Sequence, residues 1–220
     1  ILARLFEALF AEGVVVVATS NVMPRNLYKD GLQRERFLPF IDLLIERLDV
    51  FELTSETDYR LDRLRGRATY HTPLDEAAAD ALDQAFSDLT DDAEPHAETL
   101  KVRGRELIAP VTAKGVARFT FEELCARPLG AADYLAIARR FHTVILAGIP
   151  LLPPAKRNES KRFVTLIDAL YEAKVNLICS AAALPADLSP QGDTAFAFQR
   201  TVSRLMEMQA DDYIAAPHQP

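Results

Sequence analysis

The sequence predicts an α/β fold with a mainly parallel sheet and helices packed on it, and three observations lead to this prediction. The run Val14–Ala18 is continuously apolar instead of alternating, and Val175–Cys179 is apolar apart from Asn176, which is typical of strands buried on both faces of a parallel sheet. Each run follows a stretch whose apolar residues recur at helical spacing. Helices and strands then alternate through the C-terminal half of the chain, as in α/β proteins.

The first expected element is a helix over Ile1–Glu12, which ends at Gly13, a residue type that commonly follows a helix C-terminus. No capping residue precedes this helix and residue 1 is not Met, so we expect upstream sequence to be missing. The strand over Val14–Ala18 follows directly. The next expected elements are a helix over Arg34–Arg47 and a short strand over Asp49–Thr54.

The middle of the chain begins with an expected helix over Pro73–Leu89 and continues as an acidic linker up to Glu98. In the segment Thr99–Phe121, apolar residues surround Gly104 and Gly115, a pattern that predicts two hairpins with glycine turns. We expect these hairpins to be antiparallel, to lie outside the main sheet, and to be able to serve as a partner-binding insertion.

The C-terminal part is expected to contain three helices and two strands, followed by a frayed tail from Asp211. The expected helices cover Ala131–Phe141, Ser160–Ala173 and Ala195–Met208, and the expected strands cover Thr143–Ile149 and Val175–Ser180.

The chain also contains an internal repeat. The first copy, Leu5–Tyr28, aligns without gaps to the second copy, Leu166–Ser189, and both are expected to form a helix, a strand, a small polar turn and a proline-led loop. Shared ancestry is one interpretation, and the apolar period common to all α–β units is the other. With either interpretation, both strands are expected in a parallel sheet with helices packed on it.

Composition excludes several classes of protein. The hydrophobic fraction of 49% and the charged fraction of 26% are typical of a globular chain and exclude a disordered one. Lys and Arg number 25 against 32 Asp and Glu, a net charge of −7 that disfavours a general nucleic-acid coat. The apolar runs are too short to cross a bilayer. The two cysteines and four scattered histidines form neither a disulfide framework nor a metal motif, so no metal site is expected.

Two motifs have the character of a site. Thr19, Ser20 and Asn21 follow the first buried run, at the strand end where open α/β sheets bind ligands. The Asn21 amide could orient a water or contact a phosphate there, or it could close a turn. Arg34 could stabilise charge on a phosphoryl group, or it could lie at a solvated helix start paired to a carboxylate. The pair Arg200 and Arg204 shares a helix face and is most simply a solvated stripe.

Long sequence words connect the chain to a known family. VVVVATSN, LYKDGLQR and RFLPFIDLL between Val14 and Leu44, together with RFVTLIDALYEAKVNLICSA and FQRTVSRLMEMQADDY further on, resemble the ZapE / lactation-elevated family of AAA+-type P-loop ATPases. The resemblance covers nearly the whole chain apart from the acidic region 75–98. Family members carry Walker A and Walker B motifs, and no Gly-x-x-x-x-Gly-Lys-Ser/Thr occurs in this chain.

The resemblance assigns roles to individual residues. Asn21 matches the sensor 1 position, which helps to align the attacking water. Arg34 matches best as the arginine finger, which reaches the γ-phosphate bound by a neighbouring subunit, and Arg36 is the second choice. The sensor 2 arginine is one of three candidates that the resemblance leaves open, namely Arg60, Arg162 and Arg204.

The resemblance also implies a fold, a division of the chain and an activity. The fold is part of the parallel sheet of an AAA+-like P-loop NTPase plus an inserted β-hairpin segment. Residues 1–70 are expected to be the C-terminal part of the ATPase core, residues 71–125 a helix and hairpin insertion, and residues 126–220 an α/β C-terminal region. The parent is expected to be an ATPase that uses ATP and Mg²⁺, whereas this fragment, without Walker A, is expected to be inactive and to bind no cofactor.

The implied context is a cytoplasmic homo-oligomer that remodels a partner in bacterial cell division. Its client is a division protein or a membrane-associated protein, with peripheral attachment to the inner membrane as an open possibility. No specific nucleic acid and no transmembrane segment is expected. Two alternatives stay open: a non-catalytic protein-interaction module, and a fragment of a mitochondrial-type quality-control ATPase.

Overall fold

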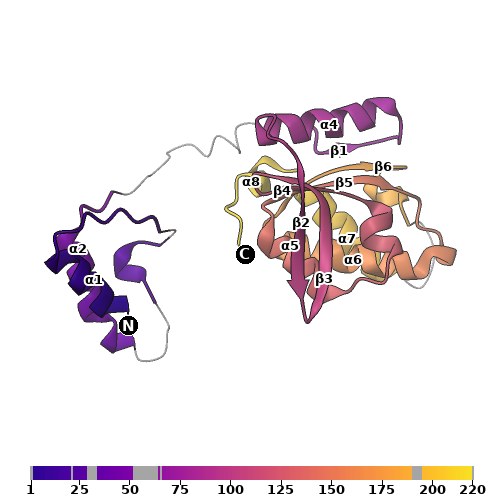
Figure 1. Cartoon of the computed structure of the whole chain (residues 1–220). Coiled ribbons are helices and arrows are strands. Elements are labelled where there is room, and N and C mark those ends of the chain that lie inside the picture. The colour runs from indigo at the N-terminus through magenta and orange to yellow at the C-terminus, as the bar shows by residue number, and fades with distance from the viewer. Residues whose placement is uncertain are drawn as a thin grey trace. The chain divides into compact units, whose positions relative to one another are not determined.

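The computed structural model describes residues 2–20, 22–28, 34–51, 64, 66–189 and 195–219. The chain divides into two compact units, Ile1–Glu56 and Thr57–Pro220, each of which is described here by itself (Figure 1). Within the described part of the chain, none of the helices combines the length and the apolar character needed to cross a bilayer.

Helices and short 3-10 turns build the first unit. Edge-to-face ring contacts join them: Phe40 lies 5.3 Å from Phe6 and 5.1 Å from Phe37, measured between ring centroids. Phe40 and Ile41 are the buried residues of the second helix. The elements are α1 (Leu2–Ala11), η1 (Pro24–Asn26), η2 (Arg34–Arg36) and α2 (Leu38–Arg47).

The prediction that Val14–Ala18 is a strand is wrong for this chain. The segment has no regular secondary structure, and Val15 and Val17 are 88% and 91% exposed. A strand forms only where a neighbour pairs with its backbone N–H and C=O groups, and residues 2–20, 22–28 and 34–51 contain no strand. The expected strand over Asp49–Thr54 is also missing from residues 49–51, and its remainder lies outside the described residues.

The second unit is a sheet of six strands in the order β1-β6-β5-β4-β3-β2. The pairs β1–β6, β6–β5 and β5–β4 are parallel, and β3 is antiparallel to both β4 and β2. The α/β fold class predicted from the sequence is thereby confirmed. The strands are β1 (Tyr70–His71), β2 (His96–Val102), β3 (Arg105–Ala113), β4 (Val116–Thr120), β5 (Thr143–Ile149) and β6 (Asn176–Ala181).

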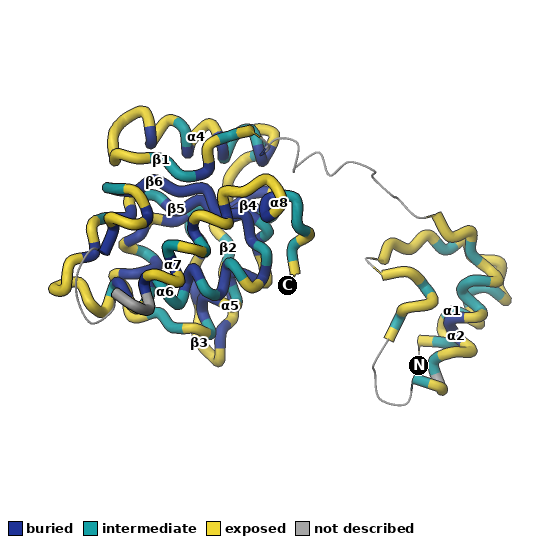
Figure 2. The backbone as a smooth tube through the Cα atoms, turned by 180° about the vertical axis from the view of Figure 1, so that it is seen from behind, coloured by how far each residue is buried: buried dark blue, intermediate teal, exposed yellow. Residues whose placement is uncertain are grey.

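Helices cover both faces of this sheet. Strand β5 shows the arrangement, because Val144 and Leu146 belong to the core on one face and Ile145 to the core on the other. The first face carries α5, α6 and α7, and the second carries α4 (Figure 2). The helices are α4 (Glu76–Thr90), α5 (Ala131–Arg140), α6 (Arg157–Glu172) and α7 (Ala195–Glu207), with the short helices η3 (Glu122–Ala126), η4 (Pro154–Lys156), η5 (Pro185–Asp187) and α8 (Asp211–Ile214).

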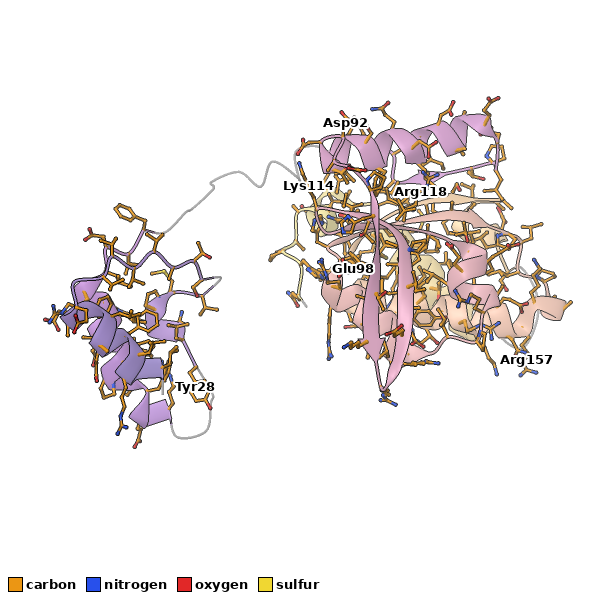
Figure 3. The ribbon with its side chains drawn as sticks, viewed as in Figure 1. Tyr28, Asp92, Glu98, Lys114, Arg118 and Arg157 are labelled. Carbon is orange, nitrogen blue, oxygen red and sulfur yellow. The ribbon has the colours of Figure 1, made fainter. Side chains whose placement is uncertain are left out.

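The two predicted hairpins exist, but the prediction that they lie outside the main sheet is wrong, since β4 pairs in parallel with β5. Gly115 lies in the β3–β4 turn with φ +80°, and a Cβ at this position would come within 2.7 Å of the His142 ring. Lys114 and Arg118 bond to Asp91 and Asp83 and so tie α4 to the hairpin (Figure 3). Apolar residues on both faces of β4 make it an interior strand.

The C-terminal tail is packed, contrary to the prediction that it is frayed. Tyr213 and Ile214 in α8 are 4% and 2% exposed. The Gln219 N–H donates to the Ala173 carbonyl at 2.8 Å. Two buried apolar side chains and a main-chain hydrogen bond outweigh the tendency of a terminus to be disordered.

Candidate functional site

Arg34 is held by main-chain oxygens of the first unit. Its Nη2 donates to the Arg25 carbonyl at 2.7 Å, and its Nε lies 3.5 Å from the Leu27 carbonyl. Both acceptors belong to the 3-10 turn η1 and its C-terminal cap, which Pro24 starts. Within the described part of the chain, Arg34 forms no ion pair with a carboxylate. The guanidinium is therefore positioned by neutral groups and keeps its full charge and further N–H donors for a ligand.

The structure describes only part of the other site residues predicted for the first 60 residues of the chain. Asn21 and Arg60 lie outside the described residues, and the side chain of Arg36 does as well. Ser20, next to Asn21, closes a local turn: its hydroxyl donates to the Val22 carbonyl at 2.8 Å and accepts the Val22 N–H at 3.2 Å.

Arg162, a sensor 2 candidate, lies in α6 and bonds to carbonyls at the C-terminal end of helix η3. Its Nε donates to the Cys125 carbonyl at 2.6 Å, and its Nη2 lies 3.5 Å from the Ala126 carbonyl. Like Arg34, Arg162 has no carboxylate partner among the described residues. Its contacts position the side chain without neutralising it.

Arg204, the third candidate, has two carboxylate partners. It bonds to Asp168 and, at 2.6 Å, to Glu172, both on α6. Its guanidinium carbon also lies 4.7 Å from the centroid of the Tyr171 ring, in a cation–π contact. Only 17% of the Arg204 side chain is exposed. The neighbouring Arg200 bonds to Asp168 as well, so the predicted solvated stripe is in fact an ion-pair network that ties α7 to α6.

The structure does not bring Arg162 and Arg204 together. Arg204 bonds α6 at Asp168 and Glu172, six to ten residues beyond Arg162, which corresponds to about 9–15 Å along the helix axis. These two arginines therefore do not converge on one phosphate group in this arrangement.

The two copies of the internal repeat end their helices with the same backbone hydrogen bond. In the first copy the Val14 N–H donates to the Leu9 carbonyl at 3.0 Å, and in the second copy the Val175 N–H donates to the Leu170 carbonyl at 3.0 Å. These four residues form two aligned pairs of the sequence repeat. Such a bond closes a helix C-terminus when the residue before its donor is left-handed.

The likeness continues on both sides of this bond. Gly13 has φ +70° and its counterpart Lys174 has φ +53°, so both copies leave the helix through a left-handed residue. Both copies then reach a proline-led 3-10 turn, Pro24–Asn26 in the first and Pro185–Asp187 in the second. The apolar period alone does not specify these positions. The copies differ in pairing, because the second forms β6 between β1 and β5 while the first is unpaired.

Polar residues also differ between the copies. Thr19 corresponds to Ser180, whose Oγ accepts the Gly148 N–H at 2.9 Å, and Asn21 corresponds to Ala182. The second copy therefore has an apolar residue where the first has an amide side chain. The strand end of β6 lacks the group that the sequence analysis singled out for the first copy.

Neither thiol has the environment of a nucleophile. Burial raises the pKa of Cys125 and of Cys179 above the ordinary value of 9.0, with the Arg162 charge opposing the rise only partly at Cys125. Both thiols are therefore protonated near neutral pH. Among the described residues, no cluster of three or more His, Cys, Asp and Glu side chains is arranged to hold a metal ion.

These features define a layered α/β unit and, in a separate unit, a positioned guanidinium that has no carboxylate partner among the described residues. The comparison with protein families then specifies the class further. The family model described as AFG1-like ATPase matches residues 1–217, and the chain belongs to that family.

Curated relatives agree with this family. The chain is 36% identical to the cell division protein ZapE of Escherichia coli over 99% of its own length. It is 39% identical, over 97% of its length, to the lactation elevated protein 1 homolog B of Danio rerio, of which it covers 49%. The chain spans 58% of the length of the Escherichia coli relative. No solved structure gives a significant match.

Proposed function

We propose that the protein to which this chain belongs hydrolyses ATP and that Arg34 acts as its arginine finger. The observation that carries the proposal is the Arg34 guanidinium, which two main-chain carbonyls position and which no carboxylate of the described residues neutralises. The family relationship supplies the reaction class. ATP bound with Mg²⁺ supplies the phosphoryl group and its developing negative charge.

Phosphoryl transfer is accelerated by such a group. The transition state spreads charge over the phosphoryl oxygens, and a positioned cation stabilises it more than it stabilises the ground state. Arg34 offers a planar fork of donors that suits phosphate oxygens. An arginine whose charge is already balanced by a carboxylate would contribute less.

The first copy of the repeat has a place in this proposal. We propose that Val14–Ala18 becomes a strand of a parallel sheet in the complete protein and that Asn21 at its end is sensor 1, orienting the attacking water. The equivalence with β6, which is paired on both sides, supports the strand. The exposure of Val15 and Val17 also supports it, since such an apolar run is a ready template for pairing.

For sensor 2 the contacts disfavour Arg204, so Arg162 and Arg60 are kept as the candidates. Arg204 already has two carboxylates and an aromatic ring as partners, and a phosphate would have to displace them. Arg162 bonds only to carbonyl oxygens among the described residues. We assign Arg204 the role of holding α7 on α6.

The wider proposal follows the resemblance of the chain to its relatives. The parent is a homo-oligomer with sites between subunits, and its client is a division or membrane-associated protein, in keeping with the name of the Escherichia coli relative. The 220-residue chain alone lacks a Walker A motif and is expected to show no ATPase activity. A non-catalytic interaction module is the second candidate, and a Gly-x-x-x-x-Gly-Lys-Ser/Thr motif in the parent reading frame would exclude it.

The test uses the full-length parent with Arg34→Ala. Nucleotide affinity should stay nearly unchanged, while turnover should fall by about 10³-fold or more, because a finger acts on charge that develops in the transition state. Arg34→Lys should not restore turnover, since lysine lacks the planar fork. Mixing Arg34→Ala subunits with subunits disabled in Walker A should restore part of the activity, because one mixed interface contains both intact parts.

The matched control is Arg47→Ala, which removes an exposed arginine from the last turn of α2 in the same unit. Its turnover should equal that of the unmodified parent. Unchanged turnover in Arg34→Ala would contradict the assignment and move it to Arg36. Equal losses in both variants would point to a general effect of charge on the unit instead of a finger.

A further inference from the structure

Two thirds of strand β3 has an outer edge that no strand of the described chain covers. Strand β3 spans Arg105–Ala113 but pairs with β4 only through Val111–Ala113. Its other edge pairs with β2 along nearly the whole length. Figure 1 shows the β2–β3 hairpin running well past the end of β4. Residues 105–110 therefore present an unpaired backbone edge, which in other proteins is a template for an added strand.

The register shows which backbone groups face outward. The two-residue turn at Arg103 and Gly104 makes Val102 and Arg105 a hydrogen-bonded pair, so alternate residues from Arg105 onward bond to β2. The N–H and C=O groups of Ile108, between them, point away from β2. Pro110 follows at an irregularity in the β2–β3 register and has no N–H. Ile108 is thus the centre of the open edge.

A groove runs along this edge. It is a cavity of about 160 Å³ with an apolar floor made by Leu107, Phe119 and Leu124, which are 4%, 2% and 1% exposed. One wall is the open edge of β3 at Ile108 and Pro110. We call this cavity the β3 groove. It has room for one aliphatic side chain, and such a side chain would be removed from water on the floor.

The opposite wall carries charge. It consists of Glu123 and Arg127, in and directly after η3. Glu123 is fixed by a reciprocal pair of bonds with Thr120: its Oε2 accepts the Thr120 N–H at 2.8 Å, and the Thr120 Oγ1 accepts the Glu123 N–H at 3.2 Å. Arg127 is exposed, and within the described residues it forms no ion pair. A ligand carboxylate would complement this cation.

We propose that the β3 groove binds an extended segment of another protein, which adds to β3 as a strand through the backbone of Ile108. The segment places an aliphatic side chain on the floor and a carboxylate at Arg127. This binding site goes beyond the ATPase activity proposed above and does not depend on it. A second copy of β3 fits less well, because antiparallel pairing centred on Ile108 sets Glu106 opposite Pro110, which has no N–H to donate.

The experiment uses the 220-residue chain and heptapeptide probes with blocked ends, a central Leu, Val and Thr at the other positions, and one Asp placed at each flanking position in turn. Binding is measured by fluorescence anisotropy, and the site is located by amide NMR shifts. At least one of the peptides that differ in Asp position should bind saturably and change the NMR chemical shift of the Ile108 amide. N-methylation along that peptide should abolish binding at every second position, because alternate amides of a strand face its partner.

Substitutions then test the two walls. Arg127→Glu should lower the affinity for the Asp peptide by roughly fivefold or more and should raise the affinity for the same peptide with Lys in place of Asp. Arg139→Glu is the matched control, since Arg139 is exposed on α5 and does not line the groove, and it should leave both affinities unchanged. Ile108→Pro removes the outward N–H without removing a bond to β2 and should abolish binding.

Several results would overturn the proposal. These are the absence of saturable binding in every register, N-methyl effects without alternation, and equal responses of the Arg127→Glu and Arg139→Glu variants. Protection of the Ile108 amide by self-association of the chain without peptide would instead assign the groove to a second copy. If Ile108→Pro fails to fold, the N-methyl series and the charge exchange at Arg127 still decide the outcome.

Discussion

Replacement of Arg204 by Met separates a structural role from a role in nucleotide sensing. Methionine keeps much of the apolar stem that packs between α6 and α7, and it removes the guanidinium with its bonds to Asp168 and Glu172. If Arg204 holds α7 on α6, the isolated chain becomes less stable without any nucleotide present. If Arg204 instead acts only as a sensor 2 residue on bound nucleotide, its loss leaves the stability of the isolated chain nearly unchanged.

The magnitude follows from the contacts. The pair with Glu172, whose side chain is 69% exposed, contributes about 0.5 kcal/mol. The pair with Asp168 lies deeper, with Arg204 only 17% exposed, and its loss costs about 1–2 kcal/mol because Asp168 loses one of its two cations. The cation–π contact with Tyr171 adds about 0.5–1 kcal/mol. We expect a total loss of about 2–3.5 kcal/mol, or roughly 4–14 °C in Tm.

The assay is urea unfolding followed by far-UV circular dichroism and by the near-UV signal of the tyrosines. Arg200→Met is the matched control, since Arg200 is 60% exposed and shares only Asp168, and it should cost less than about 1 kcal/mol. Equal losses in the two variants, or no loss in Arg204→Met, would refute the structural role and return Arg204 to the sensor 2 candidates.

Further outcomes are expected at other places in the chain. Asp133→Ala should cost about 2 kcal/mol in urea unfolding, because it removes the acceptor of the Gly130 N–H and the buried partner of Arg105. Val17→Lys should change the stability of this chain by less than about 0.5 kcal/mol but should sharply lower soluble expression of the full-length parent if the run is an interior strand there. Stability should fall as pH rises beyond about 9–10, because burial raises the pKa of Cys125 and of Tyr213 above their ordinary values of 9.0 and 10.0. The unfolded chain therefore ionises first, so the stability that these groups contribute is complete below their ordinary pKa values and is lost above them. Midpoints of urea unfolding measured against pH check this expectation.

Sequence patterns predicted the second unit well because its elements supply one another with partners. Strand β5 has the predicted bounds, Thr143–Ile149, and α5 differs from its prediction by one residue. The same continuous apolar pattern failed at Val14–Ala18. The hydrophobic pattern indicates that a segment is suited to be a buried strand. Whether the strand forms depends on a neighbouring strand, and the described residues of the first unit do not supply one.

The candidate site was less accessible to sequence reasoning. The sequence pattern could not distinguish Arg34, which has carbonyl partners, from Arg204, which has two carboxylate partners. The carbonyls near Arg34 are placed by a local turn, and the carboxylates near Arg204 come from a helix distant in sequence. The open edge of β3 was also missed. Gly104 and Gly115 predicted two hairpins but not that β3 would be longer than β4, and this difference in length creates the β3 groove.

The distribution of charge argues for a division of roles among the arginines. In the second unit, six of the eleven arginines that the structure describes have carboxylate partners, namely Arg67, Arg105, Arg118, Arg140, Arg200 and Arg204. These pairs join helices to the sheet, to the hairpin and to one another, so the cations are committed to the fold. Arg34 in the first unit and Arg162 in the second are positioned by carbonyls alone within the described residues. A cation that is fixed but not neutralised is suited to a phosphate, so substitutions of Arg34 should affect turnover, whereas substitutions of Arg204 should affect folding.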